Sequence, residues 1–524
     1  MVTQKLKKII LPHLVLSGVA LWLAFLPANY MNAGSNPDQD EFEVLSQSEL
    51  SPYNKMIRSP KITWNGYKIN RVKSFKYLGI HVDDRLNWLE HIITHGEKAN
   101  KMQQNLKRIT GGNWGISQIH RRTLYKKVIA RMLDHGSSAW CLNPTFKMKR
   151  KLSSIQRPFL LHKSGAYRTT PMTALQTILG IPPLHMQLQF EARFTTIYRL
   201  RISLPPIITD IQPQDLEMKE TGLSTHPSEH LKSNQISFED GEACIAQKDI
   251  INIFTDGSKT EHGVGAAFCV STSDIWAYQW SAKLKNNNNT VFQAELTALY
   301  EAAIYASHLP NHNTSKIYVD NRASIMASSN SNSINETARK IFKLLLTNPR
   351  IKVSWVKAHA GNIGNERADQ LAKDATQHGQ PYSHTKLPKP HIKGLLLKRM
   401  LEEWQTSWKN GDTGRRIFNI MPSVSLHPTN WIRENVIFSQ HGPFPVYLKR
   451  FHLSDSDYCS CGGIGTALHY ATECIYTVSW HMKKPATNFE QEWLKRVANN
   501  LVSRRKIRGL IKFICENRDL FRPP

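Results

Sequence analysis

Cysteine and acidic residues are both scarce in this chain. Its 524 residues include 7 cysteines in no repeating framework, so a disulfide scaffold is not expected and a reducing compartment fits better. Lys and Arg number 68 against 41 Asp and Glu, which gives a formal charge of +27. Residues 248–378 hold 14 basic and 11 acidic residues, so nearly all of this excess lies outside them. The excess indicates a polyanionic partner, nucleic acid rather than a membrane, unless it is only a solvated surface.

Long apolar runs are also lacking, with one exception near the N-terminus. The uncharged run Ile9–Leu26 follows several basic residues, which is typical of a signal peptide or a short membrane span. Pro12 and His13 interrupt this run, and no clear small-x-small cleavage site follows it. We therefore expect an intracellular protein, nuclear or cytoplasmic, with secretion or membrane anchoring as the alternative.

Composition and pattern divide the chain into five segments. These are an apolar segment with a polar connector (1–50), a basic, mainly helical region (57–211), a linker containing Pro, Ser, Thr and Glu (212–247), an α/β domain (248–378) and a C-terminal region with clustered Cys and His (379–524). No internal repeat is visible.

The α/β pattern lies in residues 248–378, where short β-branched runs alternate with helical ones. The expected strands are 251–256, 263–271, 275–282, 316–320 and 351–356, and the expected helices are 292–306, 334–347 and 365–375. Three successive strands followed by alternating helices and strands predict a five-stranded mixed sheet flanked by helices.

Four acidic residues of this domain take comparable places at one expected edge of the sheet. Asp256 and Asp320 end strands, and Glu295 and Asp369 lie in early turns of helices, where the helix dipole favours an ionised carboxylate. Four acids close together repel one another unless cations intervene, and hard oxygen ligands suit Mg²⁺ or Mn²⁺. Two such ions can activate a water and stabilise the departing oxygen in a displacement at phosphorus.

The segments around these acids resemble a known family. In order and spacing, four segments resemble the type 1 ribonuclease H domain, especially that of non-LTR retrotransposon polyproteins. They are "FTDGSK", "AELTAL", "YVDNRASI" and "WVKAHAGNIGNERADQLAK". The resemblance implies cleavage of the RNA strand of an RNA–DNA hybrid by a ribonuclease H-like fold. It also implies that the metal ligands are Asp256, Glu295, Asp320 and Asp369.

A histidine in the last of these motifs has a role implied by the same resemblance. His359 matches the family's histidine that assists proton transfer and product departure, and Gly361 and Gly364 would let its loop bend toward the acids. Asn365 and Glu366 are expected to cap and start the following helix.

The basic region before the α/β domain resembles part of non-LTR reverse transcriptases. Lys73–Ile92 is similar to the segment after the polymerase palm, and residues 116–140 are similar to the helical thumb. Asp83 and Asp84 follow the Tyr-Leu-Gly run, whereas the family's catalytic pair precedes it, so we expect a turn there. Fingers and palm are missing, so polymerase activity is not expected, but the helices could contact duplex phosphates and a separate polymerase domain could be a partner.

The C-terminal region contains a candidate zinc knuckle. Three thiols and one imidazole follow the spacing Cys459-x-Cys461-x7-His469-x4-Cys474 and could hold Zn²⁺ tetrahedrally. The first gap is tighter than usual, so free cysteines in a loop remain the alternative. A similar cluster follows the ribonuclease H domain in non-LTR polyproteins.

These observations predict a C-terminal fragment of a retrotransposon polyprotein. It would be an endonuclease that hydrolyses the RNA strand of RNA–DNA hybrids with two metal ions. The alternative is a nucleic-acid-binding module of the same origin that keeps the fold and no longer cuts.

Overall fold

The computed structural model divides the chain into two units, Thr196–Leu395 and Met1–Thr195 with Leu396–Pro524. The described residues are 42–44, 62–64, 67–69, 73–83, 86–109, 118–222, 226, 229–239, 250–272, 275–310, 314–429 and 440–521. The apolar run Ile9–Leu26, Asp84 and Cys244 lie outside them. Among the described residues, none of the helices combines the length and hydropathy needed to cross a bilayer.

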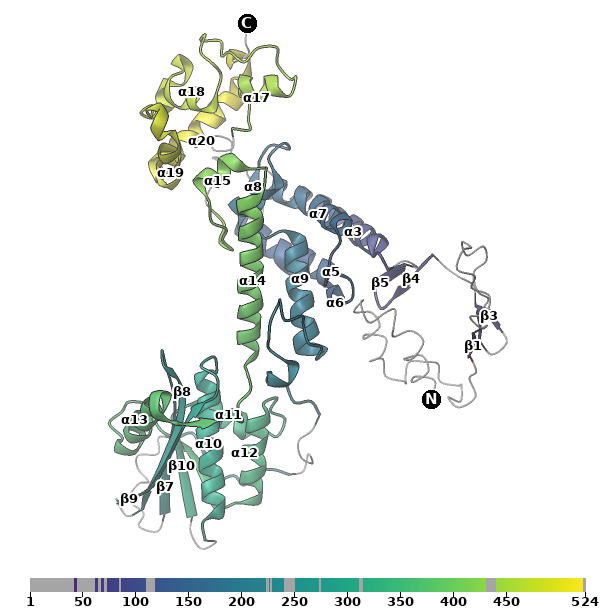
Figure 1. The fold of residues 1–524 in the computed structure, drawn as a ribbon. Coiled ribbons are helices and arrows are strands. Elements are labelled where there is room, and N and C mark those ends of the chain that lie inside the picture. Colours follow the sequence, from purple (N-terminus) through teal and green to yellow (C-terminus); the bar gives the residue numbers. More distant parts are fainter. Residues whose placement is uncertain are drawn as a thin grey trace. The chain divides into compact units, whose positions relative to one another are not determined.

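A mixed sheet forms the centre of the first unit (Figure 1). Its spatial order is β12-β9-β8-β7-β10-β11-β6. The strands are β6 (Ile236–Ser237), β7 (Ile250–Thr260), β8 (Gly263–Thr272), β9 (Ile275–Leu284), β10 (Thr314–Val319), β11 (Ile351–Trp355) and β12 (Gln380–Tyr382). β7, β8 and β9 pair antiparallel, whereas β10 and β11 continue the sheet in parallel. The predicted α/β sheet is confirmed, with seven strands rather than five because short strands are added at both edges.

Helices cover both faces of this sheet. They are α10 (Val291–His308), α11 (Arg322–Ser328), α12 (Glu336–Thr347) and α13 (Ile363–His378). Alternate strand residues point to opposite faces, so Ile253 and Phe254 of β7 enter different clusters. Ile253 packs with residues of α10 and α12, including Leu299 and Ile341, whereas Phe254 packs with Ala368 of α13.

Three local features differ from the sequence-based expectations. β7 does not end at Asp256 but continues to Thr260, because antiparallel pairing with β8 extends as far as Gly263. The short helix α11 was not expected; Asn321 caps it by accepting hydrogen bonds from two backbone amides. Part of the expected linker joins the sheet as β6, beside β11.

The second unit is mainly helical, as predicted for the basic region. It begins with the hairpin β4 (Ser74–Tyr77) and β5 (Ile80–Asp83), preceded by β1 (Phe42–Val44), β2 (Ile62–Trp64) and β3 (Tyr67–Ile69). Its helices up to residue 194 are α3 (Leu89–Ile109), α4 (Gln118–Leu124), α5 (Ala130–Asp134), α6 (Ser137–Trp140), α7 (Phe146–Ser164), α8 (Met172–Leu179) and α9 (Leu184–Phe194), with a π-helical turn at Tyr125–Ile129.

The C-terminal region completes this unit. Its main helices are α14 (Lys389–Asn410, which begins in the first unit), α15 (Arg415–Ile420), α17 (Pro445–Arg450), α18 (Ala467–Thr472), α19 (Glu490–Asn499) and α20 (Leu501–Glu516). Ile178 of α8 and Trp408 of α14 share one buried cluster with Tyr470 and Ile507. The basic region and the C-terminal region therefore form a common core, although Ile178 and Trp408 are 230 positions apart in the sequence.

Asp83 has the structural role that its position predicted. Its carboxylate accepts hydrogen bonds from the backbone amides of Asn87 at 3.1 Å and Trp88 at 2.7 Å. These contacts fix the turn between β5 and α3, where backbone amides would otherwise lack acceptors.

Buried histidines lie between β5 and α3. The rings of His91 and His95 are 4.1 Å apart between centroids, and His91 is only 1% exposed. The Nδ1 atom of His91 accepts the backbone N–H of His81 at 3.2 Å. Burial, followed by the charges of His95 and His81, lowers the pKa of His91 from 6.5 to about 3.

This pKa shift predicts acid sensitivity of the helical unit. The unfolded chain protonates His91 near pH 6.5 and the folded chain near pH 3, so stability falls as the pH drops below 6.5. We expect a loss of up to about 1.4 kcal/mol per pH unit. Hydrogen exchange of α3 amides between pH 7.5 and 5.5 measures it, and His91→Gln should reduce the dependence. Equal pH dependence in both proteins would contradict the assignment.

Candidate functional site

Two of the predicted acids meet at the centre of the sheet. β7 and β10 are parallel neighbours, and their register pairs Thr255 with Val319. Asp256 and Asp320 come next in their segments, so the pairing brings both carboxylates to the same level of the sheet. Residues 64 positions apart in the sequence thus become neighbours through strand pairing.

A glycine allows the third acid to approach. A Cβ atom on Gly257 would lie 2.4 Å from the backbone nitrogen of Glu295, so a larger residue would push α10 away from β7. Thr290 and Gln293 form a capping box at the start of α10 and fix where this helix begins. Glu295 therefore lies directly against the strand that carries Asp256.

Three carboxylates converge as a result. Asp256, Glu295 and Asp320 each offer an oxygen atom within 4.8 Å of the others. Asp256 is 6% exposed and Glu295 is 4% exposed. The fourth predicted acid, Asp369 of α13, is not among these three converging carboxylates. Its charge acts on Asp256, but it is paired with Lys373, whose Nζ lies 2.6 Å from its Oδ2 atom.

Burial and mutual repulsion disfavour ionisation of these acids. Burial, followed by the charges of Asp320 and Asp369, raises the pKa of Asp256 to about 7. Burial and the charge of Asp256 also raise the pKa of Glu295. Burial raises the pKa of Asp320 as well, opposed by the hydrogen bond from Asn365 and by the nearby His359. Carboxylates that converge in a mostly buried place are stable only with protons or cations between them.

The same atoms suit a divalent cation. The Oε2 atom of Glu295 is buried, and within the described residues it has no hydrogen-bond partner. A buried carboxylate oxygen without a donor is costly, and cation coordination would satisfy it. Clustered carboxylates are the ligands that Mg²⁺ and Mn²⁺ prefer.

The loop before α13 brings a histidine toward the acids. His359 is exposed, has a positive φ of 51° and lies close enough to Asp320 to affect its pKa. The expected cap was misplaced by three residues: Asn362, not Asn365, caps α13 by accepting the amides of Gly364 and Asn365.

Asn365 is a site residue that the sequence reasoning missed. It is buried within α13, and its side-chain Nδ2 lies 3.5 Å from the Oδ2 atom of Asp320. The Trp355 indole also donates, at 2.9 Å, to the backbone oxygen of Asp320. In the sequence, Asn365 comes shortly after Gly361 and directly after Gly364, a position that also suits a helix cap. The sequence therefore carried no distinct signal for its contact with Asp320.

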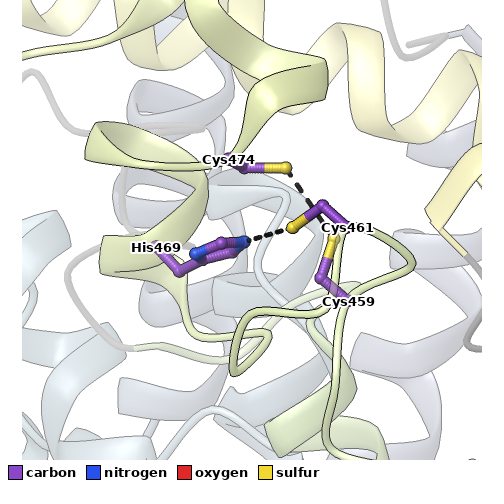
Figure 2. A group of neighbouring side chains, drawn as sticks. All are labelled: Cys459, Cys461, His469 and Cys474. Atoms are coloured by element: carbon purple, nitrogen blue, oxygen red, sulfur yellow. Dashed lines mark hydrogen bonds between the residues drawn. The ribbon is translucent and has the colours of Figure 1, made fainter.

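A second cluster, of sulfur and nitrogen atoms, lies in the C-terminal region (Figure 2). Cys459, Cys461, His469 and Cys474 each offer one atom within 4.8 Å of the others. The Sγ atoms of Cys459 and Cys474 are 3.7 Å apart, and Sγ of Cys461 lies 3.1 Å from Nε2 of His469. These two thiols are in hydrogen-bond contact, which lowers the pKa of Cys459 and raises that of Cys474.

Local backbone structure brings this second cluster together. The amide of Cys459 donates to the oxygen of Gly463 at 2.7 Å and closes a tight loop around Cys461. A Cβ atom on Gly463 would lie 2.5 Å from the ring of His469, so the loop can pack on the imidazole only with glycine there. Thr466 caps α18, the short helix that carries His469.

Fold and acidic site together define an RNase H-like α/β domain. Residues 248–377 match the family model for RNase H, so this part of the chain is an RNase H domain. It is of the kind found in retrotransposon polyproteins, as the following similarities indicate.

Similar curated proteins belong to type-1 retrotransposable elements. The putative 115 kDa protein of element R1DM from Drosophila melanogaster is 31% identical over 150 residues, which are 28% of this chain and 14% of that protein. The retrovirus-related Pol polyproteins of elements R1 2 and R1 4 from Nasonia vitripennis are both 27% identical, over 163 and 132 residues. Those matches cover 31% and 25% of this chain and 39% and 33% of the relatives. The chain thus matches less than half the length of each of these relatives.

The ion pair of Asp369 predicts competition with a metal. Lys373→Met would release this carboxylate, so Mg²⁺ should bind about 2- to 5-fold more tightly, the equivalent of up to about 1 kcal/mol for a partly exposed ion pair. Isothermal titration with Mg²⁺ at pH 7.5 measures the affinity. Lys340→Met is the matched control, because it breaks the equivalent i,i+4 pair with Glu336, which is not part of the acidic cluster. Unchanged affinity in Lys373→Met would show that Asp369 is not a ligand.

Proposed function

We propose that residues 248–378 form an active endoribonuclease that hydrolyses the RNA strand of RNA–DNA hybrids. The convergence of Asp256, Glu295 and Asp320 within 4.8 Å carries this proposal. The match of residues 248–377 to the RNase H family supports it, because such a cluster can serve phosphodiester hydrolysis.

The acids would hold two Mg²⁺ or Mn²⁺ ions. Asp256, Glu295 and Asp320 form the central ligand set, and Asp369 joins them when it leaves Lys373. Ions bound there would supply activation of a water and stabilisation of the leaving oxygen during in-line displacement at phosphorus.

Neighbouring residues would orient the metal ligands and transfer protons. Asn365 and Trp355 hold the side chain and the backbone of Asp320 from two directions, which limits its movement. His359 lies on an exposed loop beside this carboxylate, where its imidazole can transfer a proton and assist departure of the product.

Nucleic acid and a polymerase are the proposed partners. The hybrid is the substrate, and the basic helices of the second unit provide further contacts to phosphates. The resemblance of Lys73–Ile92 to a reverse transcriptase segment makes a polymerase domain a proposed partner. The rival function is a module that binds nucleic acid without cutting it, and only the presence or absence of cleavage separates the two.

Asp256→Asn tests the enzymatic proposal. We expect the full chain to cleave a labelled hybrid in Mg²⁺, and the variant to lose at least about 100-fold in kcat, because a central ligand is gone. Asp374→Asn is the control, since Asp374 is exposed on the same helix as Asp369. It should stay within about 2-fold of the wild type. Equal rates for wild type and Asp256→Asn would eliminate the proposal, and absence of cleavage by both would favour the binding module.

The free energy of unfolding of Asp256→Asn shows whether this variant still folds. The pKa of Asp256 is about 7 in the folded chain and 3.8 ordinarily, so its ionisation destabilises the metal-free domain as the pH rises through 7. Asp256→Asn should therefore raise the free energy of unfolding at pH 8, by on the order of 2 kcal/mol. Lost activity with increased stability would assign the defect to chemistry.

We also propose that the Cys/His cluster binds a structural zinc ion. The separation of 3.7 Å between Cys459 and Cys474 is close to the ~3.8 Å that two Zn–S bonds of about 2.3 Å span at a tetrahedral angle. Four ligands without an open position fit a structural rather than a catalytic site. The ion would join the loop that carries Cys461 to helix α18.

Zinc analysis tests this second proposal. We expect one Zn²⁺ per chain by mass spectrometry, with three sulfur ligands and one nitrogen ligand by X-ray absorption. Cys474→Ser should lose most of the zinc, and Cys515→Ser, an exposed cysteine outside the cluster, should retain it. A wild-type chain that stays zinc-free after incubation with ZnCl₂ would refute the site.

A further inference from the structure

A small cavity in the helical unit has two buried donors without acceptors. Its volume is about 30 Å³, and its wall includes the apolar side chains of Leu124, Phe159 and Ile181. Gln103 of α3 and Lys163 of α7 also line it. This volume accommodates one or two oxygen-sized atoms.

Both polar residues are almost completely buried. Gln103 is 4% exposed and Lys163 is 7% exposed. Among the described residues, neither Nε2 of Gln103 nor Nζ of Lys163 has a hydrogen-bond partner. An amide and an ammonium facing apolar walls are strongly disfavoured unless an acceptor, above all a negatively charged one, enters the cavity.

Two further cations surround Lys163. Burial, followed by the charges of Arg122 and Lys126, lowers the pKa of Lys163 from 10.5 to about 7. Arg122 donates from one nitrogen to the backbone oxygens of Gly180 and Leu426, but its Nε is buried without an acceptor.

The positive cluster lacks a counter-charge and reaches the surface. In the described part of the chain, no carboxylate forms an ion pair with Arg122, Lys126 or Lys163. Arg122 and Lys126 do not line the cavity, but they are half-buried and close enough for their charges to act on Lys163, so positive charge extends from Lys163 toward solvent. An anion could place one or two oxygen atoms in the cavity while its other atoms stay in solvent. It would neutralise the positive charges and accept hydrogen bonds from the two donors that lack partners.

We propose that Gln103, Lys163 and Arg122 form a binding site for a backbone phosphate of nucleic acid. A phosphodiester has two non-bridging oxygens that can enter together, and charge-assisted bonds to phosphate are stronger than those to neutral acceptors. The chain's charge of +27 favours a polyanion over an isolated ion, because neighbouring phosphates add their attraction. This site lies in the helical unit, outside the acidic cluster of the RNase H domain, and does not depend on its activity.

Salt dependence of duplex binding tests the proposal. The full chain, in buffer without added Mg²⁺, is titrated with a 20-base-pair DNA duplex at several salt concentrations. Lys163→Met keeps the length of the side chain and removes the charge, so we expect weaker binding and a slope of log K against log salt that is smaller by about 1. Gln103→Leu should weaken binding with an almost unchanged slope, since it removes a donor but no charge. The control, Lys409→Met, changes an exposed lysine in the same unit and should have a smaller effect on affinity.

Thermal unfolding identifies the source of the phosphate. In inorganic phosphate, compared with chloride of equal ionic strength, the Tm of the wild type should rise and that of Lys163→Met should not. A rise without any effect of Lys163→Met on duplex binding would overturn the assignment to nucleic acid in favour of free phosphate. An equal response of both proteins to phosphate, with equal salt slopes, would mean that Lys163 is a neutral amine in a closed cavity and would refute the site.

Discussion

Repulsion among buried carboxylates is the constraint on which the RNase H domain depends. Strand pairing brings Asp256 beside Asp320, and the close contact at Gly257 adds Glu295. Each acid raises the pKa of its neighbours, because ionised carboxylates repel one another in the folded domain. Protons or divalent cations reduce this repulsion. The packing of the rest of the domain must offset this repulsion, and the same repulsion is the basis of the proposed cation binding.

The surroundings of the acids divide into groups that hold them and groups that compete for them. Asn365 donates to Asp320 from one side without adding charge, so it orients the carboxylate. Lys373 pairs with Asp369 and so partly neutralises this carboxylate, which the proposed cations would have to displace. In the Cys/His cluster, a hydrogen bond between the sulfur atoms of Cys459 and Cys474 lowers the pKa of Cys459.

Net charge is distributed unequally between the two units, and the proposed ligand of each unit is consistent with its charge. The RNase H domain is nearly neutral, and three of its 11 acidic residues converge in one largely buried cluster. The excess of Lys and Arg lies elsewhere, and Nζ of Lys163 is buried with no hydrogen-bond partner among the described residues. The proposed ligands of the two units differ accordingly: phosphates for the basic unit and divalent cations for the acidic cluster.

Periodicity and motif spacing in the sequence determined the class of the RNase H domain, its principal strands and helices, and the identity of its acids, because these depend on local patterns. Tertiary structure alone decided the continuation of β7 beyond Asp256, the edge strands β6 and β12, and the contact of Asn365 with Asp320. It also decided the joining of the basic and C-terminal regions through Ile178 and Trp408. Those features arise from pairing and packing between distant segments, and a local pattern records that a residue is apolar or polar but not which partner it will meet.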